Sequence, residues 1–165
     1  SQVVLVTCVE RLVEEVEREL REQLDRLPRK SIAEMALKCS KYVVLNSREE
    51  CVEMANLYAP EHLMLCVEDY MARVPQIRNA GSVFLGNYST ESAGDYASGT
   101  NHTLPTNRYA RAYSGVGVDS FMKKISFQEI RPEGLAYLGK TIEMMADNEN
   151  LTAHGNAVRV RVESL

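Results

Sequence analysis

Residues that could do chemistry are concentrated in one polar run, from Gly94 to Thr106. The run GDYASGTNHTLPT contains two glycines, the carboxylate of Asp95, the imidazole of His102 and several hydroxyl groups. It offers little apolar material for a core, and its residue types are poor formers of helices and strands. We therefore predict a loop, and a loop this polar is more often a binding or reaction site than a scaffold.

The chain has only three histidines, and they lie in three separate polar segments: His62, His102 and His154. His62 is a candidate general base because an imidazole titrates near neutrality. Glu61 precedes it in APEHL and is a second candidate base. Adjacent side chains diverge on a strand or a helix, so both residues can serve one site only from an irregular turn, which Pro60 favours.

Four further residues are candidates for metal or substrate contacts. Asp95 and His154 are suitable ligand types for zinc, and His102 could bind an anionic or polar substrate group. Each candidate also has a purely structural interpretation: a loop histidine forms ordinary hydrogen bonds, Asp95 caps a turn, and Glu149 is a solvated helix-end carboxylate. From residue types and spacing alone, the chain is a candidate metal-dependent enzyme.

Alternating strand and helix patterns position these residues. We predict four short strands, over residues 2–7, 42–45, 63–67 and 82–85. Helices are predicted between them, over 9–24, 31–39, 47–55 and 69–74, and near the end of the chain, over 132–145 and 153–158. Ser31 with Glu34, and Ser47 with Glu50, have the spacing of capping boxes. Residues 121–130 are amphipathic and fit either a helix or a strand.

This alternation predicts an α/β fold, namely an incomplete Rossmann-like layered domain with a mainly parallel sheet. Ligands of such sheets bind beyond the carboxyl ends of the strands, where the loop after Leu85 would lie. Glycines at 115 and 117 suggest a boundary, which gives a catalytic-domain portion over 1–116 and a small, mostly helical C-terminal domain over 117–165. The second is too small to bury a core comfortably, so we expect it to pack on another domain or subunit.

Composition limits the class of protein. A 45% hydrophobic and 25% charged composition is typical of a folded globular protein, and a net charge of -4 argues against a nucleic-acid partner. No apolar run approaches the roughly 20 residues that span a membrane. The start of the chain lacks a signal peptide and an initiator Met, so we expect a piece of a longer protein. Four widely spaced cysteines suggest reduced, buried thiols in a cytoplasmic protein.

Several motifs together resemble the histidinol dehydrogenase family. They are APEHL at 59–63, NAGSVFLG at 79–86, ESAGDY at 91–96, NHTLPT at 101–106 and AHGNAV at 153–158. Their order and spacing also fit, and the resemblance covers essentially the whole chain. The matching region is the C-terminal portion of the enzyme. The resemblance implies an oxidoreductase of histidine biosynthesis that oxidises L-histidinol to L-histidine in two steps, with two NAD molecules and one bound zinc.

The resemblance also assigns roles to single residues. Glu61 and His62 match the catalytic pair, in which Glu61 activates water and His62 removes protons. Asp95 and His154 match two of four protein zinc ligands. The residues implied to contact substrate are His62, Asp95, His102, Glu149 and His154. Glu149 and His154 come from the partner subunit of a homodimer in this family, which agrees with a C-terminal domain that needs a partner.

Some family features are absent from this chain. The other two zinc ligands, a Gln and a His, belong to a motif upstream of Ser1, as does the nucleotide-binding domain. We therefore assign no NAD contact here and expect the chain alone to be inactive, with at most half of a metal site. Two other hypotheses remain open. The first is that the chain is a non-catalytic dimerisation fragment. The second is that it belongs to a different metal enzyme, such as a hydrolase, that reuses the motifs.

Overall fold

The computed structural model describes residues 1–165 as two units, Ser1–Met122 and Lys123–Leu165. The division falls a few residues beyond the boundary expected at 116/117. Contacts in the first unit explain its position. The N–H of Val116 donates to the carbonyl of Thr103 at 3.0 Å, and the side chain of Leu104 lies against Gly115.

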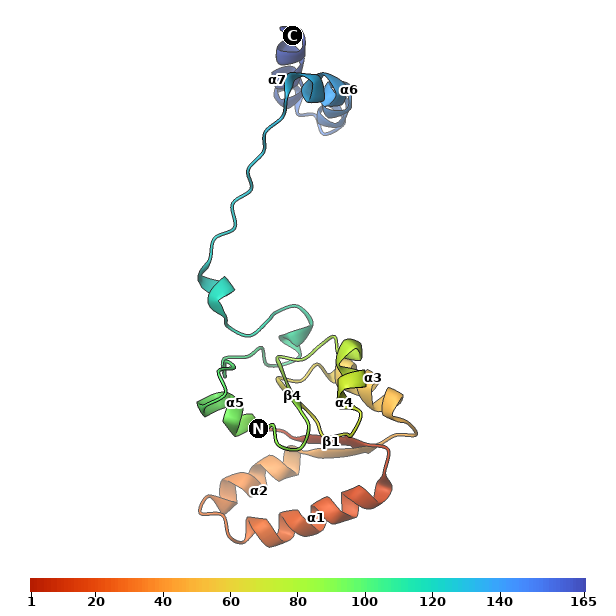
Figure 1. The fold of residues 1–165 in the computed structure, drawn as a ribbon, viewed down its shortest axis with the longest axis vertical. Coiled ribbons are helices and arrows are strands. Elements are labelled where there is room, and N and C mark those ends of the chain that lie inside the picture. The colour runs from red at the N-terminus through yellow and green to blue at the C-terminus, as the bar shows by residue number, and fades with distance from the viewer. The chain divides into compact units, whose positions relative to one another are not determined.

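The first unit begins with two parallel strands joined by two helices. Strand β1 (Val4–Thr7) pairs with β2 (Lys41–Val44), with Val4 opposite Lys41. Between them run α1 (Glu10–Leu24) and α2 (Lys30–Cys39), which lie together on one side of this strand pair (Figure 1). The capping box predicted at Ser31 is wrong. Helix α2 starts one residue earlier, after Arg29, and has no side-chain cap.

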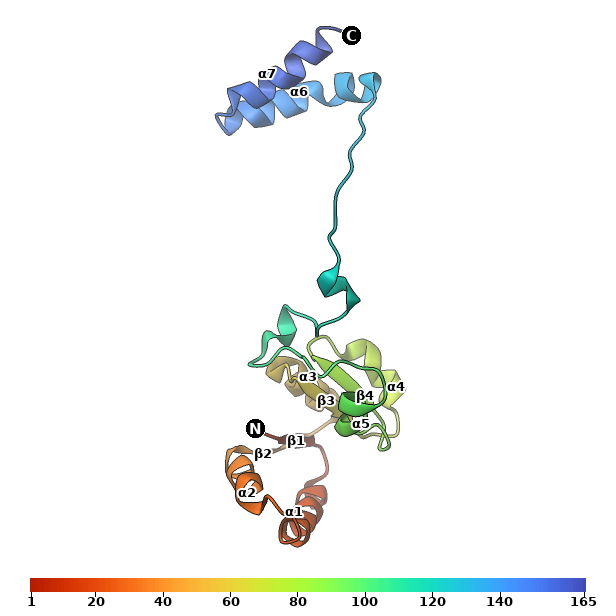
Figure 2. The ribbon, with the colours of Figure 1, turned by 90° about the vertical axis from the view of Figure 1, so that its left-hand side faces the viewer.

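A second parallel pair follows. Helix α3 (Arg48–Tyr58) leads to β3 (His62–Leu65), and α4 (Tyr70–Arg73) with the 3-10 turn η1 (Val74–Gln76) leads to β4 (Ser82–Leu85). The register places His62 opposite Ser82. Ser47 caps α3, because its hydroxyl accepts the N–H of Glu50 at 3.1 Å. The Glu50 carboxylate accepts the N–H of Asn46 and not that of Ser47, so only half of the predicted capping box forms. Figure 2 shows β3 and β4 on the side of β1–β2 away from α1 and α2.

The α/β fold class is therefore confirmed, and every paired strand is parallel. The strands form two separate two-stranded sheets, with orders β1-β2 and β3-β4. Each pair is joined by helical segments, as a parallel connection requires. The sequence indicated a single layer, because strand patterns alone do not say which strands share hydrogen bonds.

The polar run after β4 is not entirely a loop. Its first residues belong to α5 (Glu91–Tyr96), a short helix capped by Thr90, whose hydroxyl accepts the N–H of Ala93. Two 3-10 turns follow the loop, η2 (Tyr109–Arg111) and η3 (Val118–Phe121). The prediction of a loop over 94–96 is therefore wrong. The N-cap and the packing of Gly94 against Phe84, described below, outweigh the low helix propensity of GDY.

The second unit is a helical hairpin. Its helices are α6 (Pro132–Asn148), with Pro at the first position, and α7 (Thr152–Val162). They pack closely where glycines are buried, at Gly139 in α6 and Gly155 in α7. An ion pair between Arg159 and Glu143 at 3.0 Å links the two helices. The ambiguous segment 121–130 forms neither a long helix nor a strand.

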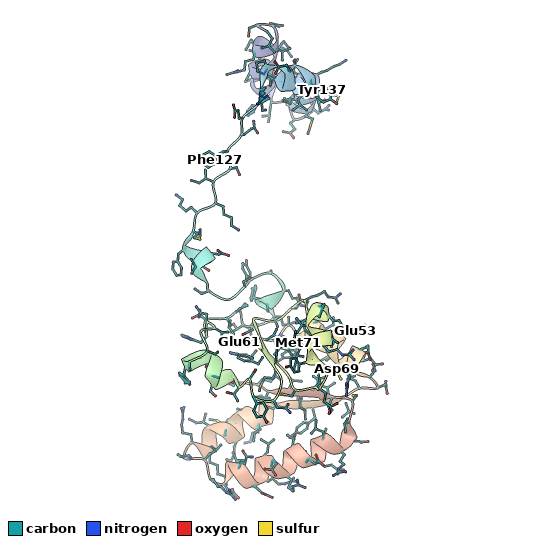
Figure 3. All side chains as sticks on the ribbon, viewed as in Figure 1. Glu53, Glu61, Asp69, Met71, Phe127 and Tyr137 are labelled. Atoms are coloured by element: carbon teal, nitrogen blue, oxygen red, sulfur yellow. The ribbon has the colours of Figure 1, made fainter.

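Apolar burial is limited in both units. No large side chain is fully buried, and aromatic residues such as Tyr88 and Phe127 are more than 90% exposed. Phe127 is labelled in Figure 3. The expectation of buried cysteines is wrong for Cys39 and Cys66, which are exposed. Cys39 is the last residue of α2, and Cys66 directly follows the buried Leu65 that ends β3, so neighbouring residues enclose neither thiol. Every helix of the chain is too short or too polar to span a bilayer.

Candidate active site

His62 is the first residue of β3, and its ring stacks on Phe84 of the neighbouring strand. The two ring centroids are 5.9 Å apart with an interplanar angle of 27°. Phe84 is buried, whereas the side chain of His62 remains 23% exposed. The aromatic contact orients the plane of the imidazole, and the side chain stays partly accessible.

Glu61 reaches the same site from the irregular turn that the sequence predicts. Ala59 ends α3 with a left-handed backbone (φ 53°), and Pro60 follows. The carbonyl of Glu61 then accepts the N–H of Ser82 at 2.9 Å, so the sheet pairing already holds Glu61 in place. Its carboxylate Oε1 lies 4.0 Å from Nδ1 of His62. Figure 3 labels Glu61 in this turn before β3.

Helix α5 brings two carboxylates to His62. Glu91 and Asp95 are separated by four residues and therefore share one face of the helix. The helix can approach closely because Gly94 has no side chain. A Cβ atom there would lie 2.7 Å from the Phe84 ring and 2.8 Å from the hydroxyl of Thr100. Close packing at Gly94 thus sets the position of both carboxylates.

The three side chains form a compact group of possible ligand atoms. One atom each from His62, Glu91 and Asp95 lies within 4.8 Å of the others. The Nε2 atom of His62 is 3.9 Å from Oε1 of Glu91 and is buried without a hydrogen-bond partner. Imidazole and carboxylate donors suit zinc, and a buried polar atom without a partner is rare in folded proteins. The Asp95 carboxylate therefore fits as one ligand of a zinc site, whereas the buried Nε2 of His62 requires a partner of its own.

The group does not lie beyond the carboxyl ends of the strands, as the sequence suggested. His62 begins β3 and Ser82, its partner, begins β4, so the group lies against the amino-terminal half of this pair. The chain reverses after β4 through Gly86, which has a φ of 80°. This turn brings α5 back over Phe84, and the expectation about the strand ends is wrong for this group.

The loop that carries His102 passes beside the Glu61 turn. A Cβ atom on Gly81 would lie 2.6 Å from the carbonyl of Glu61 and 3.2 Å from Leu104 and Pro105. Gly81 therefore lets this loop approach the turn. The side chain of His102 itself is exposed, and the loop is shaped by Asn101, whose side chain accepts the N–H of Thr103 at 2.7 Å.

Glu149 and His154 lie in the second unit, and both are exposed. Glu149 terminates α6 at its C-cap, which agrees with its structural interpretation as a helix-end residue. His154 lies in the first turn of α7, where its N–H donates to the carbonyl of Leu151 at 2.9 Å. The structure therefore brings Glu61, His62 and Asp95 together, and the placement of Glu149 and His154 at the same site stays a prediction.

Buried and charged contacts hold the elements around the site. Asn56 is 5% exposed, and its side chain accepts the N–H groups of Arg78 and Asn79 and donates to the carbonyl of Gln76. It thus anchors the segment that enters β4. The guanidinium of Arg73 hydrogen-bonds the carboxylates of Asp69 and Glu49 and lowers the pKa of each. These contacts join α3 to α4.

Two cysteines come together away from this site. Burial raises the pKa of the Cys51 thiol, and the nearby Cys8 adds to the shift. Cys51 therefore remains a protonated thiol near neutral pH, which gives it little nucleophilic or metal-binding character.

Glu91 is the site residue that sequence reasoning missed. The motif ESAGDY contains it, but the predicted loop begins at Gly94, after Glu91. The available signal was the Thr90 N-cap position followed by two carboxylates four residues apart. A helix recognised there would have placed Glu91 beside Asp95.

The sequence profile described as "Histidinol dehydrogenase" matches residues 1–162. The chain belongs to this family. Histidinol dehydrogenases of Bacteroides fragilis and Bacteroides thetaiotaomicron are 58% and 54% identical over all 165 residues of this chain. The crystal structure of histidinol dehydrogenase from Elizabethkingia anophelis matches 99% of the chain with a TM-score of 0.92 and 55% identity. The chain spans 39% of the Bacteroides relatives and 38% of that crystallised chain, so it represents the C-terminal part of a member of this family.

Proposed function

We propose that this chain supplies part of the active site of an NAD- and zinc-dependent histidinol dehydrogenase, which oxidises L-histidinol to L-histidine in the cytoplasm. The observation that carries the proposal is the assembly of His62, Glu61 and Asp95 around one half-buried imidazole. Family membership gives this arrangement its chemical context. The chain alone is expected to be inactive, because no NAD-binding residue is assigned to it.

In this proposal, His62 is the base. It takes the proton from the hydroxyl group of the alcohol in the first oxidation and returns it to the aldehyde oxygen as water adds. The neutral imidazole can then take a proton from the hydrated aldehyde in the second oxidation. Glu61 holds and deprotonates the water that adds to the aldehyde between the two steps. A histidine suits both proton transfers because its affinity for protons is matched to near-neutral pH. NAD, when bound, would accept the hydride released in each oxidation.

Asp95 and His154 would hold the zinc ion, with His154 from the partner subunit of a homodimer. Zinc would orient the substrate through its imidazole and amino nitrogens. Glu149 of the same partner and His102 would contact the substrate. The exposure of His154 and Glu149 in their own unit supports this division of roles, because both side chains are available to a second chain.

The test is the zinc affinity of the purified 165-residue chain, measured by competition with a chromogenic chelator. We expect weak binding that is lost in Asp95→Ala and in His154→Ala, since each chain would provide only part of the ligand set. Glu163→Ala, at an exposed position after α7, is the matched control and should bind like the wild type. Tight stoichiometric binding by the chain alone would overturn the proposal in favour of a different metal enzyme.

A further inference from the structure

The environment of His62 differs between its two ring nitrogens. Nε2 is buried and has no hydrogen-bond partner, whereas Nδ1 is not enclosed in this way. A neutral imidazole carries one N–H donor and one acceptor nitrogen, and its neighbours decide which nitrogen holds the proton. A reacting group can reach only a nitrogen that is accessible. The open Nδ1 is therefore suited to accept a proton, and the buried Nε2 is not.

Glu91 is the group that can satisfy the buried nitrogen. Its Oε1 atom lies 3.9 Å from Nε2, one ångström beyond an ordinary N–H···O hydrogen bond of about 2.9 Å. Catalytic hydrogen bonds are often this long before substrate binds. The Glu91 side chain is 54% exposed, so it has room to rotate toward the ring. Glu61 lies at a similar distance from Nδ1, 4.0 Å, but only the buried Nε2 lacks access to another partner. A lone pair on Nε2 would therefore face the Glu91 carboxylate with no donor to satisfy it.

The backbone of Glu91 is held firmly enough for this role. Glu91 opens α5 directly after the capping residue Thr90, and Gly94 presses the helix against Phe84. Phe84 is also the ring on which His62 stacks. The imidazole and the carboxylate are thus positioned by one shared side chain.

We propose that Glu91 is a positioning residue that accepts a hydrogen bond from Nε2–H of His62, so that Nδ1 is the nitrogen that receives the substrate proton. The carboxylate selects one tautomer and orients the ring without touching the reacting atoms. Glu61, 4.0 Å from Nδ1, is then on the reactive side of the ring, as its proposed role with water requires. The role of Nδ1 as the acceptor of the substrate proton rests on the proposed function, whereas the Nε2–H tautomer does not.

The test is a long-range proton–nitrogen correlation spectrum of the ¹⁵N-histidine-labelled chain in alkaline buffer, where imidazoles are neutral. His62→Asn identifies the signals of His62, and the exposed His102 and His154 serve as internal references. We expect the two nitrogens of His62 to be separated more widely than those of the exposed histidines, in the pattern of the Nε2–H tautomer. An Nδ1–H pattern, or one equal to that of the exposed histidines, would overturn the proposal.

Two variants sharpen this measurement. Glu91→Ala removes the acceptor, and the two nitrogen shifts of His62 should move toward each other. Glu91→Gln keeps a carbonyl oxygen and should retain most of the separation. Glu53→Ala, an exposed carboxylate on α3 labelled in Figure 3, is the charge-matched control and should change nothing. An unchanged His62 spectrum in Glu91→Ala would contradict the inference.

The outcome is independent of the zinc test. An Nε2–H tautomer in a chain whose zinc binding does not depend on Asp95 would leave the positioning role of Glu91 intact and remove only the dehydrogenase assignment. A weak zinc site that depends on Asp95, together with an Nδ1–H tautomer, would support the dehydrogenase assignment and remove the positioning role of Glu91.

Discussion

His62 and His154 place the same side chain in two contrasting environments. His62 is half-buried, stacks on Phe84 and has carboxylates near both ring nitrogens. His154 is exposed on a two-helix hairpin. The first unit therefore builds its site from close packing around a half-buried ring, whereas the second presents its candidate ligands on a helix surface. Substitutions in the two units should therefore have effects of different size and different physical cause.

The largest loss of stability is expected from Asn56→Ala. The substitution removes the acceptor of two backbone N–H groups, from Arg78 and Asn79, and the donor to the carbonyl of Gln76. Because Asn56 is buried, these groups lose their partner in a poorly hydrated place, at a cost of about 3 kcal/mol. Urea unfolding monitored by circular dichroism would measure it. Asn87→Ala, at an exposed position, is the control, and an equal effect of both variants would contradict the prediction.

Gly94→Ala tests whether close packing builds the first site. The added methyl group would overlap the Phe84 ring and the Thr100 hydroxyl, so we expect the free energy of unfolding to fall by about 1–3 kcal/mol. The nuclear magnetic resonance signals of His62 should shift as α5 moves away. Gly117→Ala provides a matched control because nothing lies within 4 Å of its added Cβ. Unchanged His62 signals in Gly94→Ala would show that α5 is not held by this contact.

Acid should weaken the first unit through the Arg73 cluster. Hydrogen bonds from Arg73 lower the pKa of Asp69 and of Glu49 in the folded chain. Their stabilisation is therefore fully present above the unfolded pKa values of about 4 and is lost as the pH falls through the lower folded values. The stability difference between wild type and Arg73→Gln should shrink from pH 7 to pH 3. A difference that stays constant would contradict this linkage.

The smallest effect is expected in the hairpin, from Gly134→Ala. Gly134 lies in the first turn of α6, and an added Cβ would meet only Ile130 at an ordinary 3.5 Å. Alanine should therefore stabilise the helix by up to about 1 kcal/mol. Thermal unfolding would detect the gain. Gly139→Ala is the contrasting variant, because its methyl group would lie 3.0 Å from Val162, and an equal gain there would show that the hairpin is loosely packed.

Local patterns predicted much of the secondary structure of this chain. The strand over 82–85 and the Ser47 cap agree with the structure, since both depend on neighbouring residues. Ser31 shows the limit of the same reasoning: its capping spacing is correct, but the helix begins before it. Helix α5 was missed because its stability comes from contact with Phe84 in another element. Helix propensity depends only on residue type and cannot predict a contact with a distant residue.

The sequence by itself determined the types and order of the reactive groups, the parallel α/β pattern and the resemblance to one enzyme family. These follow from periodicity and from motifs that are continuous along the chain. Only the tertiary structure decided that Glu91 joins His62 and Asp95, and that the group lies against the strand faces and not beyond their ends. Those facts depend on where β4 turns at Gly86 and on how closely Gly94 approaches Phe84, which are contacts between residues distant in the sequence.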